Sequence, residues 1–582
     1  MNFRDEYCGL ITEKWNSKSI TLSGWVDRTR EVGGVTFVLL RDHTGVVQLV
    51  FSSPDLIQKA HELNNEDVIM VQGIVAARNE KEINPSMKTG RIEIHVDSMQ
   101  VLNICKHSPF EVRKSMEVDE NLRMKYRYFD LRNPKMYSNI RMRHTLLQTT
   151  RKYLSHHQFT EVETPYLGKS TPEGARDFLV PSRMNPGKFY ALTQSPQLYK
   201  EMLMVGGIDR YFQICRCFRD EDFRLDRQPE FTQIDLEMAF SDEESLHHIL
   251  EGLMQQIVKN CLDQDITLPF LKMSYKEAMH TYGTDKPDLR YHVPIVHFKD
   301  EFKNPDYKMF YAATEEGNTI AALHIDKAFM NLSRKESDAF LQELENPKVT
   351  FFYVKHKPDG VGLNFLNEAD KIRIAEKMDS VEGDSILFAI GTEKDVLESL
   401  GRARTMIGKS ILEAQPYRKN ELHFLWINQF PLFLWNEDEN RLDSAQHPFT
   451  LPNMEQFHQH IDTNPLLIQS CSSDMVLNGF ELGSGGARIV DSELQKRIFS
   501  LIGVPQDQIE EQFGYLLHAL SSGAPPEAGF ALGVDRITML LTQSASLRDV
   551  IAFPKNTKGA SPLTREPSPI SEEQWKEITR QS

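Results

Sequence analysis

The chain has 582 residues, of which 40% are hydrophobic and 26% charged, and its formal net charge is −16. This length and apolar content predict about three or four domains with cores of their own. No segment approaches the roughly 20 apolar residues of a membrane-spanning helix, and the N-terminus lacks the features of a signal peptide, so we expect a cytoplasmic protein without a membrane partner. Six cysteines without a CxxC pair favour reduced thiols over disulfides or a zinc site.

Residues 20–103 alternate short apolar runs with turns and predict a five-stranded barrel. Three strand-like runs come first, the helical stretch SPDLIQKAHEL follows, and two further strand-like runs complete the segment. This is the element order of the OB fold, whose face commonly binds oligonucleotides. Arg30, Phe37 and Gln48 are candidates for stacking on unpaired bases and hydrogen bonding to them. Any small barrel carries such residues, so the pattern alone does not establish nucleic-acid binding.

The segment from Lys106 to Lys152 is basic within an acidic chain. It holds twelve Lys and Arg against five Asp and Glu, so its net charge is 12 − 5 = +7. Lys and Arg that neutralise phosphates drive nucleic-acid binding, which the overall charge of −16 would otherwise disfavour. The segment fits either a track for a phosphate backbone or a solvated linker and helix face.

A helix followed by a strand is predicted next. Apolar residues recur at Ile140, Leu147 and Leu154, a spacing typical of a helix, and FTEVETPYL then alternates up to Pro165, which ends the strand. Residues 289–418 have a different pattern, in which predicted strands such as TFFYVKH alternate with predicted helices such as EKDVLESLGRARTMIGKS. This pattern predicts a self-contained α+β insertion.

Between these two segments, a pair of strand-like runs encloses a long charged loop. The first run ends in YFQICRCFRDED, and FRLDRQPEFTQIDLEMAF follows directly. Ordinary hairpins reverse within about two to five residues, whereas this loop is longer and places Arg219 and Glu221 at the end of the first strand and Gln228 on the return. Cys215 and Cys217 share one face of the first strand, where we expect them in the core.

Three further segments, residues 170–203, 472–489 and 523–541, are rich in glycine and ionisable side chains. None contains a P-loop, a dinucleotide-binding GxGxxG pattern or a nucleophile elbow. The sequence therefore does not indicate a P-loop NTPase, a Rossmann protein or a serine hydrolase of the α/β type.

Three stretches resemble the signature motifs of class II aminoacyl-tRNA synthetases. They are the strand and proline at Phe159–Pro165 after their helix, FRDE at Phe218–Glu221, and GFALGVDR at Gly529–Arg536. With TPEGARDFLV, QSPQLYK and NGFELGSGGARI between them, they resemble the bacterial-type aspartyl-tRNA synthetase family over nearly the whole chain.

The resemblance implies a multidomain α+β homodimer with an N-terminal OB-fold β-barrel, a class II antiparallel-sheet catalytic domain and an inserted α+β domain. The expected segments are the anticodon-binding barrel (1–105), a hinge (106–135), the first part of the catalytic domain (136–288), the insertion (289–418), the second part of the catalytic domain (419–560) and a C-terminal extension (561–582).

The resemblance also implies an ATP-dependent ligase that forms aspartyl-adenylate and diphosphate, and then transfers aspartate from AMP to the 3′ end of tRNA-Asp, in some members also of tRNA-Asn. The barrier to adenylate formation comes mainly from repulsion between the carboxylate and the α-phosphate and from their poor relative orientation. Cations held in position can therefore catalyse the step without a general base. The implied catalytic residues are Arg219, which bridges the α-phosphate and the amino-acid carboxylate, Glu221 on the adenine side, and Arg536, which stacks on the adenine. The remaining ATP site is expected to comprise Asp220, Gln228, Glu481, Gly533, Val534 and Asp535. Gly529 and Gly533 are expected to let the backbone approach the nucleotide.

The expected aspartate site follows from charge. An aspartate side chain needs cations, for which Lys200, Arg488 and His447 are available. Its ammonium group needs acceptors, for which Glu173, Ser195, Gln197 and Asp235 serve, and Glu173 lies in a stretch that resembles a closing loop with Gly174 as its hinge. Asp474 and Glu481 are the expected ligands of Mg²⁺, together with the ATP phosphates. The anticodon is expected to contact Phe37, Gln48 and Glu93, with Arg30 beside them.

Two positions depart from the family pattern. The family usually has two adjacent histidines before PFT, whereas here Gln446 precedes His447, and it usually has histidine where this chain has Glu527. Neither change removes an expected phosphate or carboxylate ligand.

Three alternatives to this reading are a catalytically silent tRNA-binding paralogue and the related asparaginyl- and lysyl-tRNA synthetases. The presence of the expected catalytic residues disfavours the first, and the insertion and the cationic pocket disfavour the other two. The range of tRNAs stays open, because Val32 in REVGGV does not decide between tRNA-Asp alone and both tRNAs.

Overall fold

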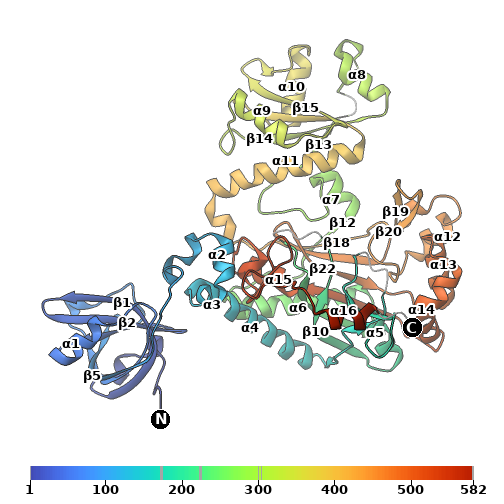
Figure 1. Ribbon diagram of the computed structural model, residues 1–582. Helices are drawn as coiled ribbons and strands as arrows, with labels where there is room; N and C mark the ends of the chain where they lie inside the picture. Colours follow the sequence, from blue (N-terminus) through green and yellow to red (C-terminus); the bar gives the residue numbers. More distant parts are fainter. Residues whose placement is uncertain (1, 171–174, 222–225, 299–300, 303, 580–582) are drawn as a thin grey trace. The chain divides into compact units, whose positions relative to one another are not determined.

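The structure is a computed structural model that describes residues 2–170, 175–221, 226–298, 301–302 and 304–579 (Figure 1). The chain divides into two compact units. The first comprises Met1–His144, Asp222–Gln228 and Thr538–Ser571, and the second comprises Thr145–Glu221, Pro229–Ile537 and Glu572–Ser582. Within the described ranges, no helix has the length and apolar character needed to cross a membrane.

The first unit contains a closed barrel in the order β1-β2-β3-β5-β4 (Figure 1). Its elements are β1 (Ser19–Val32), β2 (Val35–Asp42), β3 (Gly45–Phe51), α1 (Pro54–His61), β4 (Val68–Ala77) and β5 (Ile92–Asn103). Burial alternates along β4, because one face of the strand fills the barrel and the other faces outward. The predicted order of three strands, a helix and two strands is confirmed, and closure of the barrel leaves it without a free edge.

Short helices follow the barrel and pack on the C-terminal segment of the same unit. They are α2 (Glu120–Lys125), α3 (Arg127–Asp130) and the start of α4 (Pro134–His156), and the C-terminal segment contains the 3₁₀ helix η8 (Leu547–Asp549).

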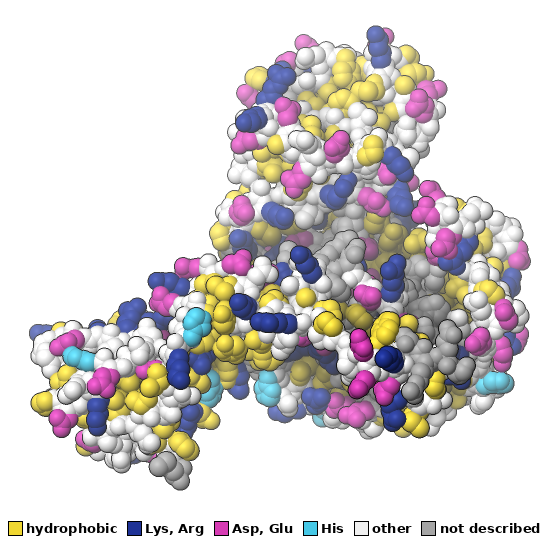
Figure 2. Space-filling model, viewed as in Figure 1, with side chains coloured by type: hydrophobic (Ala, Val, Ile, Leu, Met, Phe, Trp, Pro, Cys, Tyr) yellow, Lys and Arg dark blue, Asp and Glu magenta, His cyan; other side chains and the backbone are white. Residues whose placement is uncertain are grey.

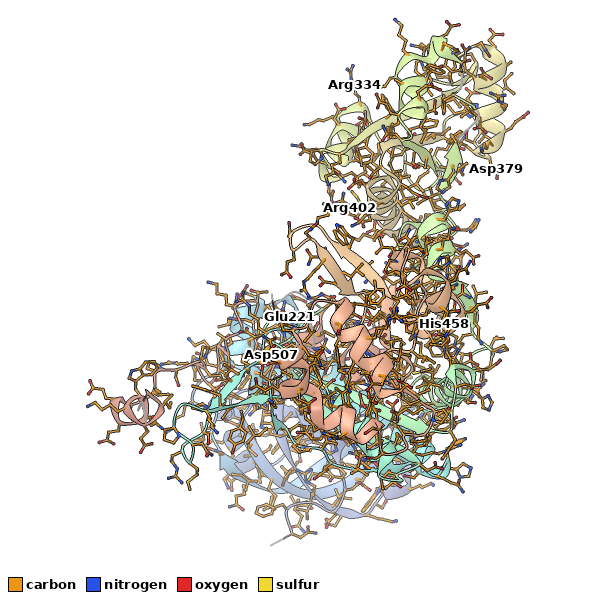
Figure 3. The ribbon with its side chains drawn as sticks, turned by 90° about the vertical axis from the view of Figure 1, so that its right-hand side faces the viewer. Glu221, Arg334, Asp379, Arg402, His458 and Asp507 are labelled. Carbon is orange, nitrogen blue, oxygen red and sulfur yellow. The ribbon has the colours of Figure 1, made fainter. Side chains whose placement is uncertain are left out.

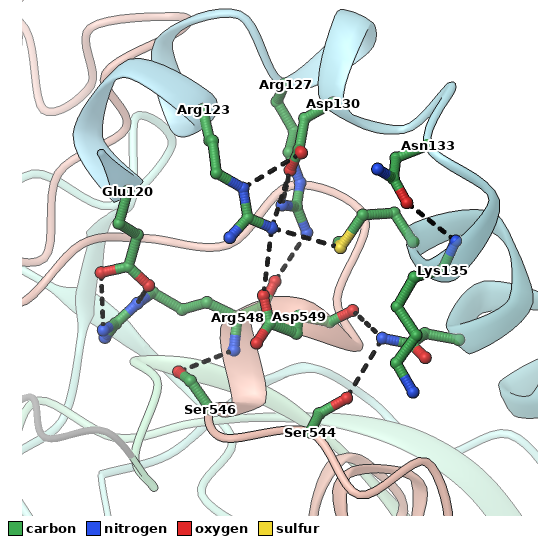
Figure 4. Close-up of polar contacts among 12 residues, drawn as sticks. Glu120, Arg123, Arg127, Asp130, Asn133, Lys135, Ser544, Ser546, Arg548 and Asp549 are labelled. Carbon is green, nitrogen blue, oxygen red and sulfur yellow. Dashed lines mark hydrogen bonds and ion pairs between the residues drawn. The ribbon is translucent and has the colours of Figure 1, made fainter. Parts of the chain in front are cut away.

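Buried arginines hold these helices to the C-terminal segment (Figure 4). Arg127 donates to the backbone oxygens of Arg548 at 2.6 Å and of Ile551 at 2.7 Å. Arg548 in turn makes two bonds to Glu120, at 2.7 and 2.9 Å. Arg123 and Arg127 are only 7% and 3% exposed. These two arginines therefore act inside the protein and cannot serve as phosphate contacts, so neither interpretation of the basic segment, a phosphate track or a solvated face, describes them.

The second unit is built on an eight-stranded sheet in the order β12-β18-β21-β22-β23-β11-β10-β6. Its strands are β12 (Leu271–Ser274), β18 (Phe424–Asn428), β21 (Ser472–Leu477), β22 (Phe480–Ala487), β23 (Glu527–Gly533), β11 (Glu230–Ala239), β10 (Arg210–Phe218) and β6 (Thr160–Glu161). The strands from β18 to β10 are antiparallel, whereas β12 and β6 add a parallel strand at each edge. The predicted antiparallel catalytic sheet is confirmed, and Cys215 and Cys217 of β10 are buried as predicted.

The second unit also contains helices and smaller strands. The helices are α5 (Gln197–Val205), α6 (Glu243–Leu262), α7 (Tyr275–Tyr282), α12 (Met454–His460), α13 (Ser492–Leu501), α14 (Gln506–Leu520), α15 (Val534–Leu541) and α16 (Glu572–Thr579), and the smaller strands are β7 (Leu167–Gly168), β8 (Leu179–Pro181), β9 (Phe189–Leu192), β19 (Phe433–Asn436) and β20 (Arg441–Ser444). Side chains alternate between the two faces of β11, so Asp235 and Glu237 point toward α5 while Ile234 and Leu236 lie on the other face. The charged face of β11 is where the candidate site forms.

The insertion has a five-stranded sheet of its own, in the order β13-β14-β17-β15-β16. Its elements are β13 (Val296–Phe298), α8 (Lys308–Glu315), β14 (Thr319–Ile325), α9 (Arg334–Glu343), β15 (Val349–Lys357), β16 (Gly360–Val361), α10 (Glu368–Lys377), β17 (Ser385–Gly391) and α11 (Glu393–Ala414). All seven residues of β17 are buried, because separate apolar cores cover the two faces of the sheet. Side chains of both charges are interspersed on the surface of the insertion that Figure 2 shows. Arg334 and Asp379, labelled in Figure 3, are exposed residues of this domain.

Candidate active site

The β10–β11 hairpin places Arg219 directly after the end of strand β10. The two strands pair without a bulge from Arg210 opposite Met238 to Phe218 opposite Glu230. The Arg219 N–H then donates to the Pro229 oxygen at 2.9 Å, and its guanidinium lies over the Phe231 ring at 5.2 Å. Within the described ranges the buried Nε of Arg219 has no hydrogen-bond partner. The ring thus holds a guanidinium that retains donor capacity for an anion.

The other predicted residues of this hairpin have different surroundings. The Asp220 N–H donates to the Arg176 oxygen at 3.0 Å, and Glu221 is the last residue described before the tip of the loop (Figure 3). Gln228 belongs to the first unit, where its amide bonds twice to the Lys555 backbone, at 2.8 and 3.0 Å. The amide of Gln228 is therefore already engaged by the protein.

The third motif runs from β23 into α15. Arg536 donates to the backbone oxygen of Glu481, which brings two predicted ATP residues together. Asp535 is 3% exposed and accepts from the Thr232 N–H at 2.9 Å, so this carboxylate ties α15 to β11, and Val534 is fully buried at the start of the helix. A Cβ added at Gly533 would meet only ordinary contacts, the nearest at 3.5 Å.

Gly529 lies against a carboxylate of the protein itself. A Cβ added there would lie 1.7 Å from Oε2 of Glu237. A protein carboxylate therefore occupies the space that a side chain at this position would need, and the approach of a nucleotide to Gly529 stays a prediction. The predicted value of glycine for close approach holds, but the group that approaches is Glu237.

Four buried charges form a closed ion-pair cluster on β11. The Lys200 ammonium lies 3.0 Å from Asp235 and 3.1 Å from Glu237. Arg488, just after β22, makes two bonds to Glu237, at 3.0 and 3.3 Å. None of the four is more than 3% exposed. Burial raises the pKa of Asp235 to about 6 against the opposing effect of Lys200, so this carboxyl is ionised at neutral pH.

His447 contacts this cluster as a neutral group. Arg488 Nη1 lies 2.8 Å from its Nε2, so the ring nitrogen accepts from the guanidinium. Burial, followed by the charges of Arg488 and Lys200, holds the pKa of His447 well below its usual range. The prediction that His447 supplies a third cation for an aspartate side chain is therefore wrong, although the prediction that it lies beside Arg488 and Lys200 is right.

Two further buried carboxyl groups adjoin the cluster. Glu201 accepts from Gln197 Nε2 at 2.5 Å through one oxygen, while the other oxygen has no hydrogen-bond partner in the described part of the chain. Neither carboxyl oxygen of Glu527 has one there either. Burial raises the pKa of Glu201 to about 7, and burial together with the charges of Glu237 and Glu201 raises the pKa of Glu527 to about 10.

The predicted acceptors for an ammonium group are partly described. Ser195 lines a cavity of about 260 Å³ with Thr193, Gln194 and Asp177. Its hydroxyl lies 3.3 Å from the Gln197 N–H, so Ser195 and Gln197 are neighbours at the start of α5. Glu173 and Gly174 lie outside the described residues.

The predicted metal ligands lie on adjacent strands. Asp474 is on β21 and Glu481 on β22, and Gln446 donates to Asp474 at 3.0 Å. Burial and then the charge of Glu481 raise the pKa of Asp474 well above its usual range. Among the residues that can be described, no group of three or more His, Cys, Asp or Glu side chains could hold a metal ion by itself. Two carboxylates that repel one another fit a hard cation that takes its remaining ligands from phosphate and water.

On the barrel, all four predicted anticodon residues form one network. The Arg30 guanidinium lies 5.1 Å from the Phe37 ring centre and donates to Gln48 at 3.0 Å. Gln48 donates to Glu93 at 3.1 Å. Arg78, which the sequence analysis missed, lies 3.4 Å from Glu93.

Glu237 and Glu201 are the charged cluster residues that the sequence analysis missed. The alternation Gln233, Asp235, Glu237 along β11 is the signal that could have found Glu237, because residues two apart on a strand share a face. Glu201 follows Lys200 directly, so only the structure shows that both side chains reach the same cluster.

The sequence match that accompanies this antiparallel sheet, hairpin arginine and buried cluster identifies a class II aminoacyl-tRNA synthetase catalytic domain. Residues 119–557 match the family described as "tRNA synthetases class II (D, K and N)", and residues 20–102 match "OB-fold nucleic acid binding domain". The chain belongs to the class II tRNA synthetases of this D, K and N family.

Relatives extend the likeness over the whole chain. It is 41% identical to "Aspartate–tRNA(Asp/Asn) ligase" of Anoxybacillus flavithermus, over 99% of this chain and 98% of the relative, and 42% identical to the protein of the same name in Bacillus subtilis, again over 99% and 98%. The solved asparaginyl-tRNA synthetase of Pyrococcus horikoshii with asparaginyl-adenylate has a TM-score of 0.59 at 18% identity, over 94% of this chain and 97% of that one. At this identity the structural match shows the fold alone.

Proposed function

We propose that this protein is an aspartyl-tRNA synthetase of the form that charges both tRNA-Asp and tRNA-Asn. The observation that carries the proposal is the buried cluster on β11, in which Lys200 and Arg488 supply positive charge for a side-chain carboxylate and Asp235 supplies an acceptor for an ammonium group. Similarity to aspartate–tRNA(Asp/Asn) ligases over 99% of the chain supports the same substrate.

In the proposed first step, an oxygen of the aspartate α-carboxylate attacks the α-phosphorus of ATP. The bond from that phosphorus to the bridging oxygen breaks, diphosphate leaves with the electron pair, and aspartyl-adenylate remains. Arg219, held over Phe231, would bind the α-phosphate and the carboxylate and so reduce their repulsion. Arg536 would stack on the adenine from the start of α15, and Glu221 would lie on the adenine side.

We propose Mg²⁺ as the metal, with Asp474 and Glu481 as its protein ligands. When bound, the ion supplies positive charge that neutralises the phosphates. Gln446, which donates to Asp474, would orient that carboxylate.

In the second step, a hydroxyl of the terminal ribose attacks the aspartyl carbonyl and AMP leaves. The barrel would bind the anticodon through the network of Arg30, Phe37, Gln48 and Glu93, since a stacked ring flanked by donors and acceptors suits unpaired bases. Because both tRNAs serve translation, we propose a cytoplasmic location.

We also propose that the chain works as a homodimer, with the domain boundaries expected from the sequence. Support for a dimer comes from apolar side chains exposed on and beside the small β7–β9–β8 sheet: Leu167 (48%), Leu179 (58%), Phe189 (50%) and Tyr190 (42%). Light scattering at micromolar concentration would measure the mass, and a monomer of 67.1 kDa would contradict the dimer.

The function is tested by charging transcribed tRNA-Asp and tRNA-Asn side by side with labelled aspartate and ATP. Charging of both supports the proposal, and charging of tRNA-Asp alone restricts the enzyme to the discriminating form. If folded enzyme charges neither, the proposed function is wrong. Parallel reactions with labelled asparagine and lysine test the two related specificities.

A further inference from the structure

The buried cluster on β11, taken together with the two carboxyl groups that adjoin it, contains more negative than positive groups. Four carboxyl groups, those of Glu201, Asp235, Glu237 and Glu527, surround the two cations Lys200 and Arg488. The most exposed of the six residues is Arg488 at 3%. If every group were ionised, the cluster would carry 2 − 4 = −2, in a place that water cannot screen.

The ion pairs show which carboxyls are compensated. Asp235 and Glu237 both contact Lys200, and Glu237 also makes two bonds to Arg488. These four groups are electrically balanced. No described cation lies in ion-pair distance of Glu201 or Glu527, and three of their four carboxyl oxygens have no hydrogen-bond partner within the described residues.

The groups around these two carboxyls come from several elements. Glu201 of α5 faces Arg488 after β22, Glu237 of β11, and Lys200 and Gln197 of its own helix. Glu527 of β23 faces Glu237, Glu201, Arg488 and Lys200. Each carboxyl thus has another carboxyl as a neighbour and shares cations that are already paired.

A substrate carboxylate could not enter a site of charge −2 without strong repulsion. If Glu201 and Glu527 are neutral acids, the cluster carries 2 − 2 = 0 and the cations can attract an additional carboxylate. We propose that Glu201 and Glu527 hold protons in the aspartate-binding enzyme, and that loss of the Glu201 proton weakens aspartate binding. This inference rests on the proposed function. Glu201 and Glu527 act as positioning residues, because they set the charge that Lys200 and Arg488 present.

The two carboxyls lose their protons in different pH ranges. Burial raises the pKa of Glu201 to about 7 and that of Glu527 to about 10. Asp235, with a pKa raised to about 6, is already ionised above neutrality, and Lys200 and Arg488 have raised pKa values and stay charged. Glu201 is thus the group of this cluster that ionises between about pH 7 and pH 8.5.

The experiment measures the KM for aspartate in ATP–diphosphate exchange by the full-length enzyme from about pH 7 to pH 8.5, at saturating ATP. If only the protonated form binds aspartate, the KM should rise by about tenfold over this range, while the KM for ATP should not follow the same course. In E201Q a permanent neutral amide replaces the acid, so the rise should disappear. E527Q is the matched control, since it also replaces a buried carboxyl of the cluster but should retain the rise. A flat KM in the wild type, or a rise that survives in E201Q, overturns the inference.

A second measurement does not depend on variants. Calorimetric titration of wild-type enzyme with aspartate near pH 8, in buffers of different ionisation enthalpy, counts protons taken up on binding. We expect close to one proton per aspartate, and zero uptake would contradict the proposal. Exchange activity with a KM independent of pH would refute this inference alone, whereas absence of aspartate-dependent exchange at every pH would refute the proposed function as well.

Discussion

Two polar regions of this protein use the same kinds of side chain, but one is partly exposed and the other is fully buried. On the barrel, Arg30 is exposed, its partner Gln48 is buried at 5%, and Glu93 is partly exposed. On β11, Lys200 and Arg488 are at most 3% exposed, and their ion pairs are shielded from water. Similar hydrogen-bond lengths therefore correspond to different energies, because the effective dielectric constant differs.

This difference in burial determines what each region can do. Exposed groups contribute little to stability and are screened by salt, but they can exchange their partners for those of a ligand at low cost. Buried ion pairs lose much when one partner is removed, and they hold a fixed geometry around a small substrate. The barrel network therefore suits a large partner whose polar groups replace the partners of the barrel side chains, whereas the cluster on β11 suits recognition of a single carboxylate.

The largest effect is expected from Lys200→Met. The substitution leaves Asp235 and Glu237 buried without their shared cation, which should lower the free energy of unfolding by about 3–5 kcal/mol. Aspartate-dependent exchange should fall at least about a hundredfold, since a substrate carboxylate would then face uncompensated negative charge. Urea unfolding and diphosphate exchange measure the two quantities.

Lys259→Met is the matched control for this prediction. Lys259 also contacts two carboxylates, Asp263 at 3.1 Å and Asp265 at 3.3 Å, but it is on the surface. We expect its urea midpoint to equal that of the wild type within error. Equal destabilisation by the two substitutions would show that burial does not set the strength of these pairs.

An intermediate effect is expected from Gly529→Ala. The new Cβ would overlap Oε2 of Glu237 at 1.7 Å and force that carboxylate away from Arg488. Such overpacking should cost about 1–3 kcal/mol and raise the KM for aspartate. At Gly533 the nearest atom would be 3.5 Å away, so Gly533→Ala should leave the free energy of unfolding close to that of the wild type. If Gly529→Ala is as stable as Gly533→Ala and raises only the KM for ATP, Gly529 serves the nucleotide after all.

These glycines illustrate what could be predicted from the sequence. The barrel order and the burial of Cys215 and Cys217 depend on local alternation and turn spacing, so they were predicted correctly from the pattern, whereas the antiparallel sheet was predicted from the family resemblance. That Gly529 needs to be glycine could be predicted, but its neighbour could not. Strand β23 reaches Glu237 only through its register with β11, and register between strands about 290 residues apart leaves no local pattern in the sequence.

The charge states of the site could not be predicted from the sequence for the same reason. His447 was predicted beside the right cations, but its neutrality follows from burial and from the nearness of Arg488, which only the fold provides. Glu527 was noticed as a departure from the family pattern without a role. Its charged neighbours come from β11, α5 and the residue after β22. Its effect on the site can therefore be argued only from the fold that brings them together.

The smallest change in stability is expected from Arg30→Ala on the barrel. Removal of an exposed guanidinium over the half-buried Phe37 ring should cost less than about 1 kcal/mol in unfolding. If the network binds the anticodon, the KM for tRNA should nevertheless rise several-fold, and the dependence of binding on salt should weaken by about one counterion. Arg91→Ala, at a barrel arginine that is 68% exposed and outside the network, is the control and should change the KM for tRNA less. Diphosphate exchange in the absence of tRNA separates the two regions, because it does not involve the barrel. A defect of Arg30→Ala in this exchange would mean that Arg30 acts through the catalytic unit. The proposed difference in role between the exchangeable barrel network and the fixed buried cluster would then be wrong.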